Sequence, residues 1–223
     1  MNYLKALADN SAQNSLATRL RKKRFRFFLS LVERLPRPIS ILDVGGTAQF
    51  WEQMGWGELH SAQIMLANVV EPEAKQPGFH YTLVDGRSMP FHDGQFDVVF
   101  SNSVIEHVGN SRDQQQFAHE VRRVGKRFFI QTPNYYFPLE PHFLFPGFQF
   151  LPLSIRTFLL QHLDLGWTRK ISDQEKAREV VTAVRLLTSR ELRVLFPGSM
   201  IYRERFLGIT KSLIAYGGWE HSA

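Results

Sequence analysis

Three polar side chains, each placed at or near the end of an apolar run, could bind a ligand together. They are Asp43, Asn68 and Asp85, and the dipeptide Gly45-Gly46 follows the first of them. Carboxylate and amide oxygens accept hydrogen bonds from hydroxyl and amino groups, while glycine lets the backbone approach a ligand closely. The pattern therefore suits a ligand with ribose hydroxyls, an adenine edge and an amino-acid tail.

Five apolar runs of strand length supply the elements that would position these side chains. The runs are Ile39–Val44, Ala62–Val70, His80–Val84, Phe96–Ser101 and Arg127–Thr132. Helical patterns separate them, such as residues 113–124, where Phe117, Val121 and Val124 share one face. Strands that alternate with helices form a parallel sheet, so the predicted fold class is α/β.

The last part of the chain predicts two further helices and a final hairpin. Ser172-Asp173-Gln174-Glu175 has the capping-box pattern of a helix start. A second helix is predicted at 189–196, where it ends before Pro197-Gly198. The runs Tyr202–Phe206 and Thr210–Tyr216 would then close the sheet as an antiparallel hairpin.

A basic amphipathic helix is predicted at 15–35, ahead of the first strand. Apolar residues recur there at helical spacing, and Pro36 and Pro38 end the helix. Six cations fall within it, at Arg19, Arg21, Lys22, Lys23, Arg24 and Arg26. The preferred interpretation is a solvated face, and the alternatives are contact with an anionic membrane surface and nucleic-acid binding.

Length and composition predict one domain over residues 1–223. A chain with 43% apolar residues can bury a full core at this length. The absence of cysteine excludes disulfides, thiolate nucleophiles and thiolate zinc sites. No run of 18 apolar residues occurs, and Met1-Asn2-Tyr3-Leu4-Lys5 lacks the features of a secretory signal. We therefore expect a cytoplasmic protein.

The most specific motif is an ordered pair of segments in the middle of the chain. Asp85-Gly86-Arg87-Ser88-Met89-Pro90-Phe91 is followed by Phe96-Asp97-Val98-Val99-Phe100-Ser101-Asn102-Ser103-Val104-Ile105-Glu106-His107-Val108. With Asp43-Val44-Gly45-Gly46 ahead of them, they resemble class I S-adenosylmethionine-dependent methyltransferases, especially the small-molecule branch that includes quinone-biosynthesis enzymes. The resemblance implies a Rossmann-like sheet, mostly parallel, with S-adenosylmethionine as cofactor.

The resemblance also implies roles for individual residues. Gly45 and Gly46 would let the backbone approach the methionine part of the cofactor, and Asp43 would orient its amino group directly or through water. Asp85 would accept a hydrogen bond from the adenine amino group, with clearance from Gly86. The remaining cofactor-binding residues implied in this way are Thr47, Arg87, Ser101, Asn102 and Ser103.

Two departures from the family pattern affect the cofactor site. The glycine-rich turn continues with Thr47 and Gln49 where the family has further glycines, and Asn68 replaces the acid that follows the second strand. An amide still hydrogen-bonds a ribose hydroxyl, but without the strength of a charge-assisted bond. Asn68 is therefore the predicted ribose-binding residue, with Glu71 as a nearby substitute.

His107 is the predicted catalytic residue. An unperturbed imidazole suits proton removal at neutral pH, although a packed histidine at a helix start is the alternative. Glu106-His107 also resembles the metal-binding end of some hydroxyl-directed methyltransferases, in which another carboxylate lies one helical turn earlier. Ser103 occupies that position here, and two ligands make a poor site. We therefore predict no metal.

The segment 134–167 interrupts the strand–helix alternation and is predicted to be an insertion or lid. It holds four prolines and the six residues Phe137, Phe143, Phe145, Phe148, Phe150 and Phe158. Such a segment either covers the sheet or walls a pocket for an apolar acceptor. His142, Tyr135 and Tyr136 supply polar points within it, which favours the pocket.

These features predict methyl transfer from S-adenosylmethionine to an oxygen, carbon or nitrogen atom of a small acceptor that is lipid-like or glycan-linked. One alternative is a transfer-RNA methyltransferase that holds phosphates with the cations between Arg19 and Arg26. The other is a non-catalytic S-adenosylmethionine-binding regulator or partner, suggested by Thr47, Gln49 and Asn68.

Overall fold

The structure is a computed structural model that describes Lys5, Ala12 and residues 15–56 and 62–219. The residues Met1 to Leu4, which entered the expectation about a secretory signal, lie outside the described residues. None of the helices in the described part of the chain combines the length and the hydropathy needed to cross a membrane.

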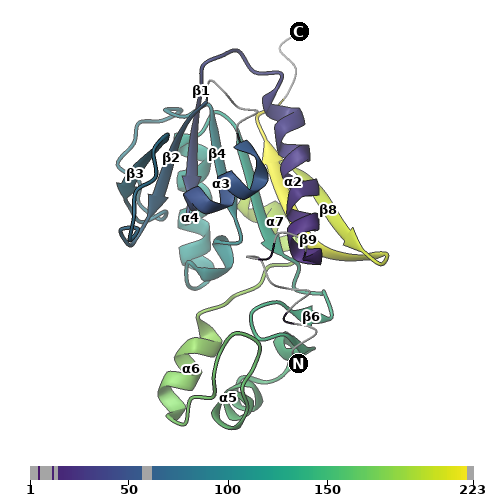
Figure 1. The fold of residues 1–223 in the computed structure, drawn as a ribbon. Helices are drawn as coiled ribbons and strands as arrows, with labels where there is room; N and C mark the ends of the chain where they lie inside the picture. The colour runs from purple at the N-terminus through teal and green to yellow at the C-terminus, as the bar shows by residue number, and fades with distance from the viewer. Residues whose placement is uncertain (1–4, 6–11, 13–14, 57–61, 220–223) are drawn as a thin grey trace.

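A seven-stranded sheet with the order β3-β2-β1-β4-β5-β9-β8 forms the centre of the molecule (Figure 1). Its strands are β1 (Ile39–Val44), β2 (Ala62–Asn68), β3 (Phe79–Leu83), β4 (Val98–Asn102), β5 (Phe128–Pro133), β8 (Met200–Phe206) and β9 (Ile209–Gly217). Strands β1 to β5 are mutually parallel, while β9 runs antiparallel to β5 and β8 antiparallel to β9. This confirms the predicted α/β class and the closing hairpin.

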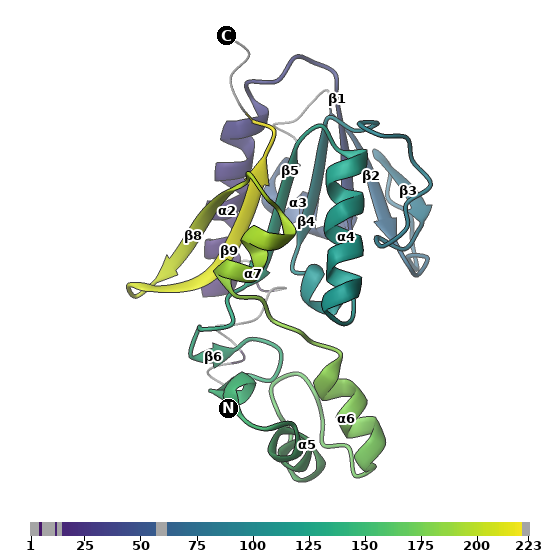
Figure 2. The same ribbon diagram turned by 180° about the vertical axis from the view of Figure 1, so that it is seen from behind.

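Two helices cover each face of the sheet. Figure 1 shows α2 (Leu16–Val32) and α3 (Ala48–Met54) on one face, and Figure 2 shows α4 (Ser111–Val124) and α7 (Ser189–Leu195) on the other. Each face has its own apolar core, because the side chains of successive strand residues point to opposite sides. The sheet is therefore buried on both faces, as its near-continuous apolar strands require.

Side chains cap all four of these helices, with Thr47 at the start of α3. The Ser15 hydroxyl accepts a hydrogen bond from the backbone of Thr18 at the start of α2. Asn110 and Thr188 form reciprocal capping boxes with the third residue of α4 and α7, respectively. Such caps satisfy backbone N–H groups that have no partner within a helix.

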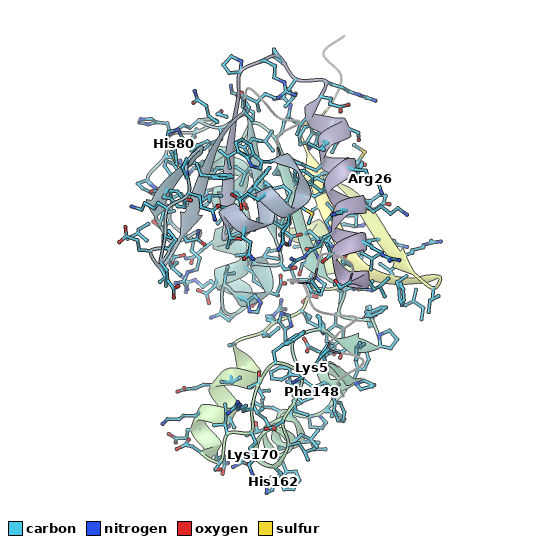
Figure 3. All side chains as sticks on the ribbon, viewed as in Figure 1. Lys5, Arg26, His80, Phe148, His162 and Lys170 are labelled. Carbon is cyan, nitrogen blue, oxygen red and sulfur yellow. The ribbon has the colours of Figure 1, made fainter. Side chains whose placement is uncertain are left out.

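Helix α2 presents two chemically different faces. Phe25, Phe28, Leu29 and Val32 are buried against the sheet and α3, together with the cation Arg24. The four exposed cations are Arg19, Lys22, Lys23 and Arg26. Figure 3 shows Arg26 on the outer side of the helix. The surface of α2 therefore carries fewer exposed cations than the six that the sequence places in this helix.

A separate lobe lies beyond the carboxyl ends of the strands (Figures 1 and 2). It contains β6 (Leu139–Glu140), β7 (Phe145–Pro146), η3 (Phe148–Phe150), α5 (Leu153–His162) and α6 (Gln174–Thr182). Its apolar core includes Phe148 of η3, Leu160 of α5 and Val181 of α6. The inserted unit therefore continues past residue 167, because α6 packs on α5 and shares its core. Helix α6 is capped by Asp173, whose side chain accepts from the backbone of Lys176, and not by Ser172.

The aromatic cluster between α2 and the sheet allows a test of the packing. Phe28 is fully buried, with its ring centroid 4.8 Å from that of Phe100 and 5.3 Å from that of Phe129. Phe28→Ala should lower the free energy of unfolding by about 3–5 kcal/mol, because apolar contact is lost and a cavity is left. Phe158→Ala, at a residue that is 57% exposed, should change it by less than about 1 kcal/mol. Urea unfolding measures both, and equal losses would contradict the packing.

Candidate functional site

A cavity of about 370 Å³ opens where the parallel strands end. Its wall comes from the turns after β1 and β2, the segment after β3, the segment around η2 (Ile105–His107), and Phe117 of α4. Six predicted site residues line it, namely Gly45, Asn68, Asp85, Gly86, Arg87 and His107. The structure thus brings together residues that lie far apart in the sequence, such as Gly45 and His107, which are 62 positions apart.

Two glycines on this wall are required by sterics. Gly45 has a φ of +77°, and a Cβ there would lie 2.5 Å from a methyl group of Val104. A Cβ on Gly86 would lie 2.9 Å from the ring of Phe117. A side chain at either position would force neighbouring atoms to move and would narrow the cavity.

Asp43 lies behind the glycine turn and does not line the cavity. Its Oδ2 accepts a hydrogen bond from Trp51 Nε1 at 2.7 Å, and a Cβ on Gly46 would overlap the carboxyl group. The other oxygen, Oδ1, is buried without a hydrogen-bond partner among the described residues. Burial raises the pKa of Asp43 to about 7. Asp43 therefore supports the turn from below, and its predicted contact with a cofactor amino group stays a prediction.

Asn68 faces both the glycine turn and the cavity. Its Nδ2 donates to the carbonyl of Gly46 at 2.9 Å, so its Oδ1 remains to accept from a ligand hydroxyl. Glu71, the predicted substitute, is exposed, contacts Lys75 at 2.9 Å and lines a small neighbouring hollow. Of the two residues, only Asn68 lines the larger cavity.

Two charged side chains, Asp85 and Arg87, line the cavity and form an ion pair, which Arg87 extends to Asp113 outside it. Arg87 contacts the Asp85 carboxylate at 2.6 Å and Asp113 at 3.1 Å. The hydrogen bonds and charge of Arg87 hold the pKa of Asp85 below its usual range, so Asp85 is ionised at neutral pH. A ligand amino group would compete with Arg87 for this acceptor. Sequence reasoning missed Asp113, because its helix position carries no signal of a partner 26 residues away.

The remaining predicted residues make contacts within the fold. Thr47 caps α3, since its hydroxyl accepts from the backbone of Phe50. Ser101 is buried and donates to the carbonyl of Val44 at 2.9 Å. The side chain of Asn102 accepts from Arg24 at 2.5 Å. None of the three lines the cavity, and their predicted cofactor contacts stay predictions.

Ser103 differs from its neighbours because its φ is +58°, in the left-handed region. Its hydroxyl donates to Gln131 Oε1 at 2.9 Å, and the residue lines a second cavity of about 260 Å³ beneath α2. Leu16 and Leu20 of α2 and Trp167 of the lobe contribute apolar surface to that cavity.

A third and larger cavity of about 770 Å³ lies between the sheet domain and the lobe. Gly109 belongs to its wall and also to the wall of the 370 Å³ cavity, so the two meet at this residue. Tyr135, Phe143 and Phe148 contribute aromatic surface, and Arg156 contributes a guanidinium whose Nε is buried and has no partner in the described part of the chain. Sequence reasoning missed Arg156, since isolated arginines occur throughout the chain.

His107 faces a histidine of the lobe. Its Nε2 lies 3.1 Å from Nε2 of His142, and His142 Nδ1 lies 2.6 Å from Glu140 Oε1. Loss of hydration and the neighbouring charge of His142 lower the pKa of His107 to about 4. The ring is therefore uncharged at neutral pH, but it is a weaker base than the ordinary imidazole that the sequence suggested.

Glu106 is fully buried beside this histidine pair. One carboxyl oxygen accepts from the hydroxyl of Thr132 at 3.0 Å, and the other, Oε1, has no partner among the described residues. Burial raises the pKa of Glu106 to about 7. Loss of hydration lowers the pKa of His142, but the hydrogen bond and charge of Glu140 outweigh this and raise it overall. The prediction of no metal counted two candidate ligands, and the structure brings a third.

Comparison with known proteins points to one family. Residues 42–127 match the family described as Methyltransferase domain. An uncharacterized protein of Mycobacterium tuberculosis is 37% identical over 62 residues, which are 28% of this chain and 21% of that protein. Malonyl-[acyl-carrier protein] O-methyltransferase of Pseudescherichia vulneris is 26% identical over 93 residues, which are 40% of this chain and 37% of that enzyme. The matches thus span well under half of these relatives.

The fold is shared over nearly the whole chain. A SAM-dependent methyltransferase from Aquifex aeolicus superposes with a TM-score of 0.52 at 13% identity, over 96% of each chain. The family match and this fold bear out the expectation of a Rossmann-like methyltransferase domain with S-adenosylmethionine as its cofactor. The narrower likeness to quinone-biosynthesis enzymes stays a prediction.

The buried carboxyl group of Asp43 generates a prediction on pH. Its pKa is about 7 in the folded protein and near 3.8 when unfolded, so the folded state binds the proton more tightly. This contribution to stability is complete below about pH 4 and is lost as the pH rises to about 7, by up to about 1.4 kcal/mol per pH unit. In Asp43→Asn that part of the slope should disappear, whereas Glu73→Gln, at an exposed position, should keep it. Urea unfolding from pH 5 to pH 8 measures the slopes, and parallel curves for wild type and Asp43→Asn would contradict the assignment.

Proposed function

We propose that this protein transfers the methyl group of S-adenosylmethionine to a small acceptor held beneath the lobe. The observation that carries the proposal is the meeting of two cavities at Gly109, one lined by the predicted cofactor residues and the other walled by the lobe. A methyltransferase needs this arrangement, because donor and acceptor must approach each other in line. The match of residues 42–127 to a methyltransferase domain supports it.

The residues on the wall of the smaller cavity support one orientation of the cofactor. In it, adenine would lie near Asp85 and Gly86, the ribose hydroxyls near Asn68, and the methionine part beside Gly45. This order follows the strand order β3-β2-β1, so the chain of contacts runs along the sheet edge. In this orientation the methyl group would point toward His107 and Gly109, and Gly109 also lines the acceptor cavity.

The acceptor cavity suits an apolar molecule with a polar group. Phe143, Phe148 and Tyr135 provide apolar wall, while Arg156 provides a cation, one nitrogen of which has no partner among the residues that the structure describes. An amphipathic, lipid-like or glycan-linked acceptor satisfies both kinds of surface. The O-methyltransferase activity named for the relative from Pseudescherichia vulneris is compatible with an oxygen acceptor in this chain as well.

The protein's part in the chemistry is positioning, exclusion of water and removal of a proton. The sulfonium already activates the methyl group, so the new bond forms as the carbon–sulfur bond breaks and its electron pair passes to sulfur. Where the acceptor is a hydroxyl, its proton must leave, and His107 is the uncharged group on the cavity wall that accepts it. The products are the methylated acceptor and S-adenosylhomocysteine.

The exposed cations of α2 support a secondary role in contact with an anionic surface. Arg19, Lys22, Lys23 and Arg26 face outward along the helix. A peripheral membrane contact is one use of these charges, and nucleic-acid binding is the less favoured use. Cofactor binding without turnover on any cell fraction would instead favour a regulator.

The cofactor site can be tested by calorimetry with S-adenosylmethionine and S-adenosylhomocysteine. Gly45→Val should weaken binding of both by at least about tenfold, because the side chain meets Val104 and disfavours the backbone conformation. Asp85→Ala should weaken it by about tenfold through loss of the adenine acceptor. Glu73→Ala, an exposed change on the loop before β3, is the control. Wild-type affinity in both cavity variants would remove the cofactor from this cavity.

The acceptor and the role of His107 can be tested together. Incubation with labelled cofactor and fractionated cell extract, followed by mass identification, names the molecule that gains a methyl group. With that acceptor, His107→Ala should lower kcat by about a hundredfold or more while cofactor affinity changes little. His119→Ala, at an exposed position of α4, should leave both unchanged. Full activity of His107→Ala would eliminate the residue from the chemistry.

A further inference from the structure

Three side chains with metal-binding atoms converge at the junction of the sheet domain and the lobe. Glu106 and His107 come from η2, and His142 comes from the segment after β6. One ligand atom from each lies within 4.8 Å of the others. A carboxylate and two imidazoles are a ligand set that suits a divalent transition metal.

The geometry of the histidine pair fits coordination to one ion. The two Nε2 atoms lie 3.1 Å apart. Ligand nitrogens at about 2.0–2.1 Å from a zinc ion are separated by about 2.9–3.4 Å in octahedral or tetrahedral arrangements. The separation of the two nitrogens therefore matches that of two ligands of one ion.

Glu140 fixes the orientation that His142 needs as a ligand. Its carboxylate lies 2.6 Å from His142 Nδ1 and accepts from the backbone N–H groups of His142 and Phe143. With the ring proton on Nδ1, the lone pair is on Nε2, which faces His107. A carboxylate on the outer nitrogen of a metal-binding histidine is the usual support for such a ligand.

Glu106 supplies the negative charge of the site. The carboxyl group is fully buried, Thr132 satisfies one oxygen, and Oε1 has no partner among the described residues. A buried carboxylate without a compensating charge is costly, and a cation beside it removes that cost. Thr132 also holds the carboxylate in place, so that the unpartnered oxygen can serve as a ligand.

We propose that Glu106, His107 and His142 bind one divalent transition-metal ion of the zinc type, at the junction of the sheet domain and the lobe, beside the cofactor cavity that His107 lines. Three protein ligands leave coordination positions open, which is the arrangement of a catalytic and not a structural metal. Since His107 also lines the cofactor cavity, the open positions lie close to the methyl group in the proposed complex.

A metal ion at this position favours an acceptor that reacts through a hydroxyl oxygen. This part of the inference rests on the proposed methyltransferase function. An acceptor hydroxyl that binds the ion loses its proton more readily, and the proton passes to solvent. The metal-bound oxygen then attacks the methyl carbon, the carbon–sulfur bond breaks, and its electron pair leaves with S-adenosylhomocysteine. When the ion is bound, His107 is one of its ligands and the proton goes to solvent; in the protein without the ion, His107 is the group that accepts the proton, as proposed above.

Metal binding can be measured without any turnover. After treatment with a chelator, the protein is titrated with Zn²⁺ by calorimetry, and one equivalent should bind. Glu106→Gln keeps the size of the side chain and its Thr132 contact, and it should weaken binding by about a hundredfold, as should His142→Ala. Glu140→Gln should weaken it by about 10- to 100-fold. His119→Ala and His80→Ala, the latter on the outer strand β3 (Figure 3), are controls that should bind like wild type.

Two results separate this inference from the proposed function. Retained S-adenosylmethionine affinity in Glu106→Gln shows that the variant is folded, so its loss of Zn²⁺ binding then supports the site. Zinc uptake by wild type that does not exceed that of folded Glu106→Gln would overturn the metal site, whether or not methyl transfer is found. If zinc binds but removal of the metal leaves methylation of the identified acceptor unchanged, the oxygen-activating role is overturned.

Discussion

The parallel alignment of β1 between β2 and β4 is the constraint on which the site depends. Asp43 pairs with Leu66 of β2 and Phe100 of β4, so all three strands end at one edge of the sheet. Parallel strands require crossover connections, and helices α3 and α4 supply two of them within the domain. The turns after the strands consequently gather at that edge, where the glycine turn, Asn68 and Asp85 surround one cavity.

A buried network around Arg24 closes the same edge on the side of α2. Arg24 contacts Glu204 of β8 at 2.7 Å and donates to Gln131 of β5 and Asn102 of β4. Glu204 also accepts from Ser212 of β9 at 2.6 Å. The network joins helix α2 to the four strands β4, β5, β8 and β9. Because its ion pair and hydrogen bonds need specific distances, it fixes the position of α2 over the cavity that Ser103 lines.

The lobe completes the site because it supplies what the strand ends lack. The sheet edge provides hydrogen-bonding groups and an apolar wall around the smaller cavity, and the lobe adds the wall of a second, larger cavity. Phe143, Phe148 and Arg156 of the lobe enclose the larger cavity, and His142 of the lobe reaches His107. Since the lobe has its own core, different acceptors can be accommodated by changes there without altering the sheet.

The sequence by itself determined the features that arise from local pattern. The strand runs, the hairpin and the glycine turn were predictable, since apolar periodicity and residues such as Gly45 act over a few positions. The gathering of Asn68, Asp85 and His107 followed from the rule that parallel strands end at a common edge. Strand ends shifted by at most two residues from the predicted runs, because exposed Val69 and other terminal residues fall outside the ladders.

Only the tertiary structure decided which side chains face the cavity and which are committed elsewhere. Asp43 turns toward Trp51 behind the glycine turn, and Arg24 turns inward to Glu204, although its spacing placed it in a basic cluster. The pairing of His107 with His142 joins positions 35 residues apart. Such contacts depend on how a helix or a lobe packs against the sheet, and packing at long sequence separation leaves no periodic signal in the chain.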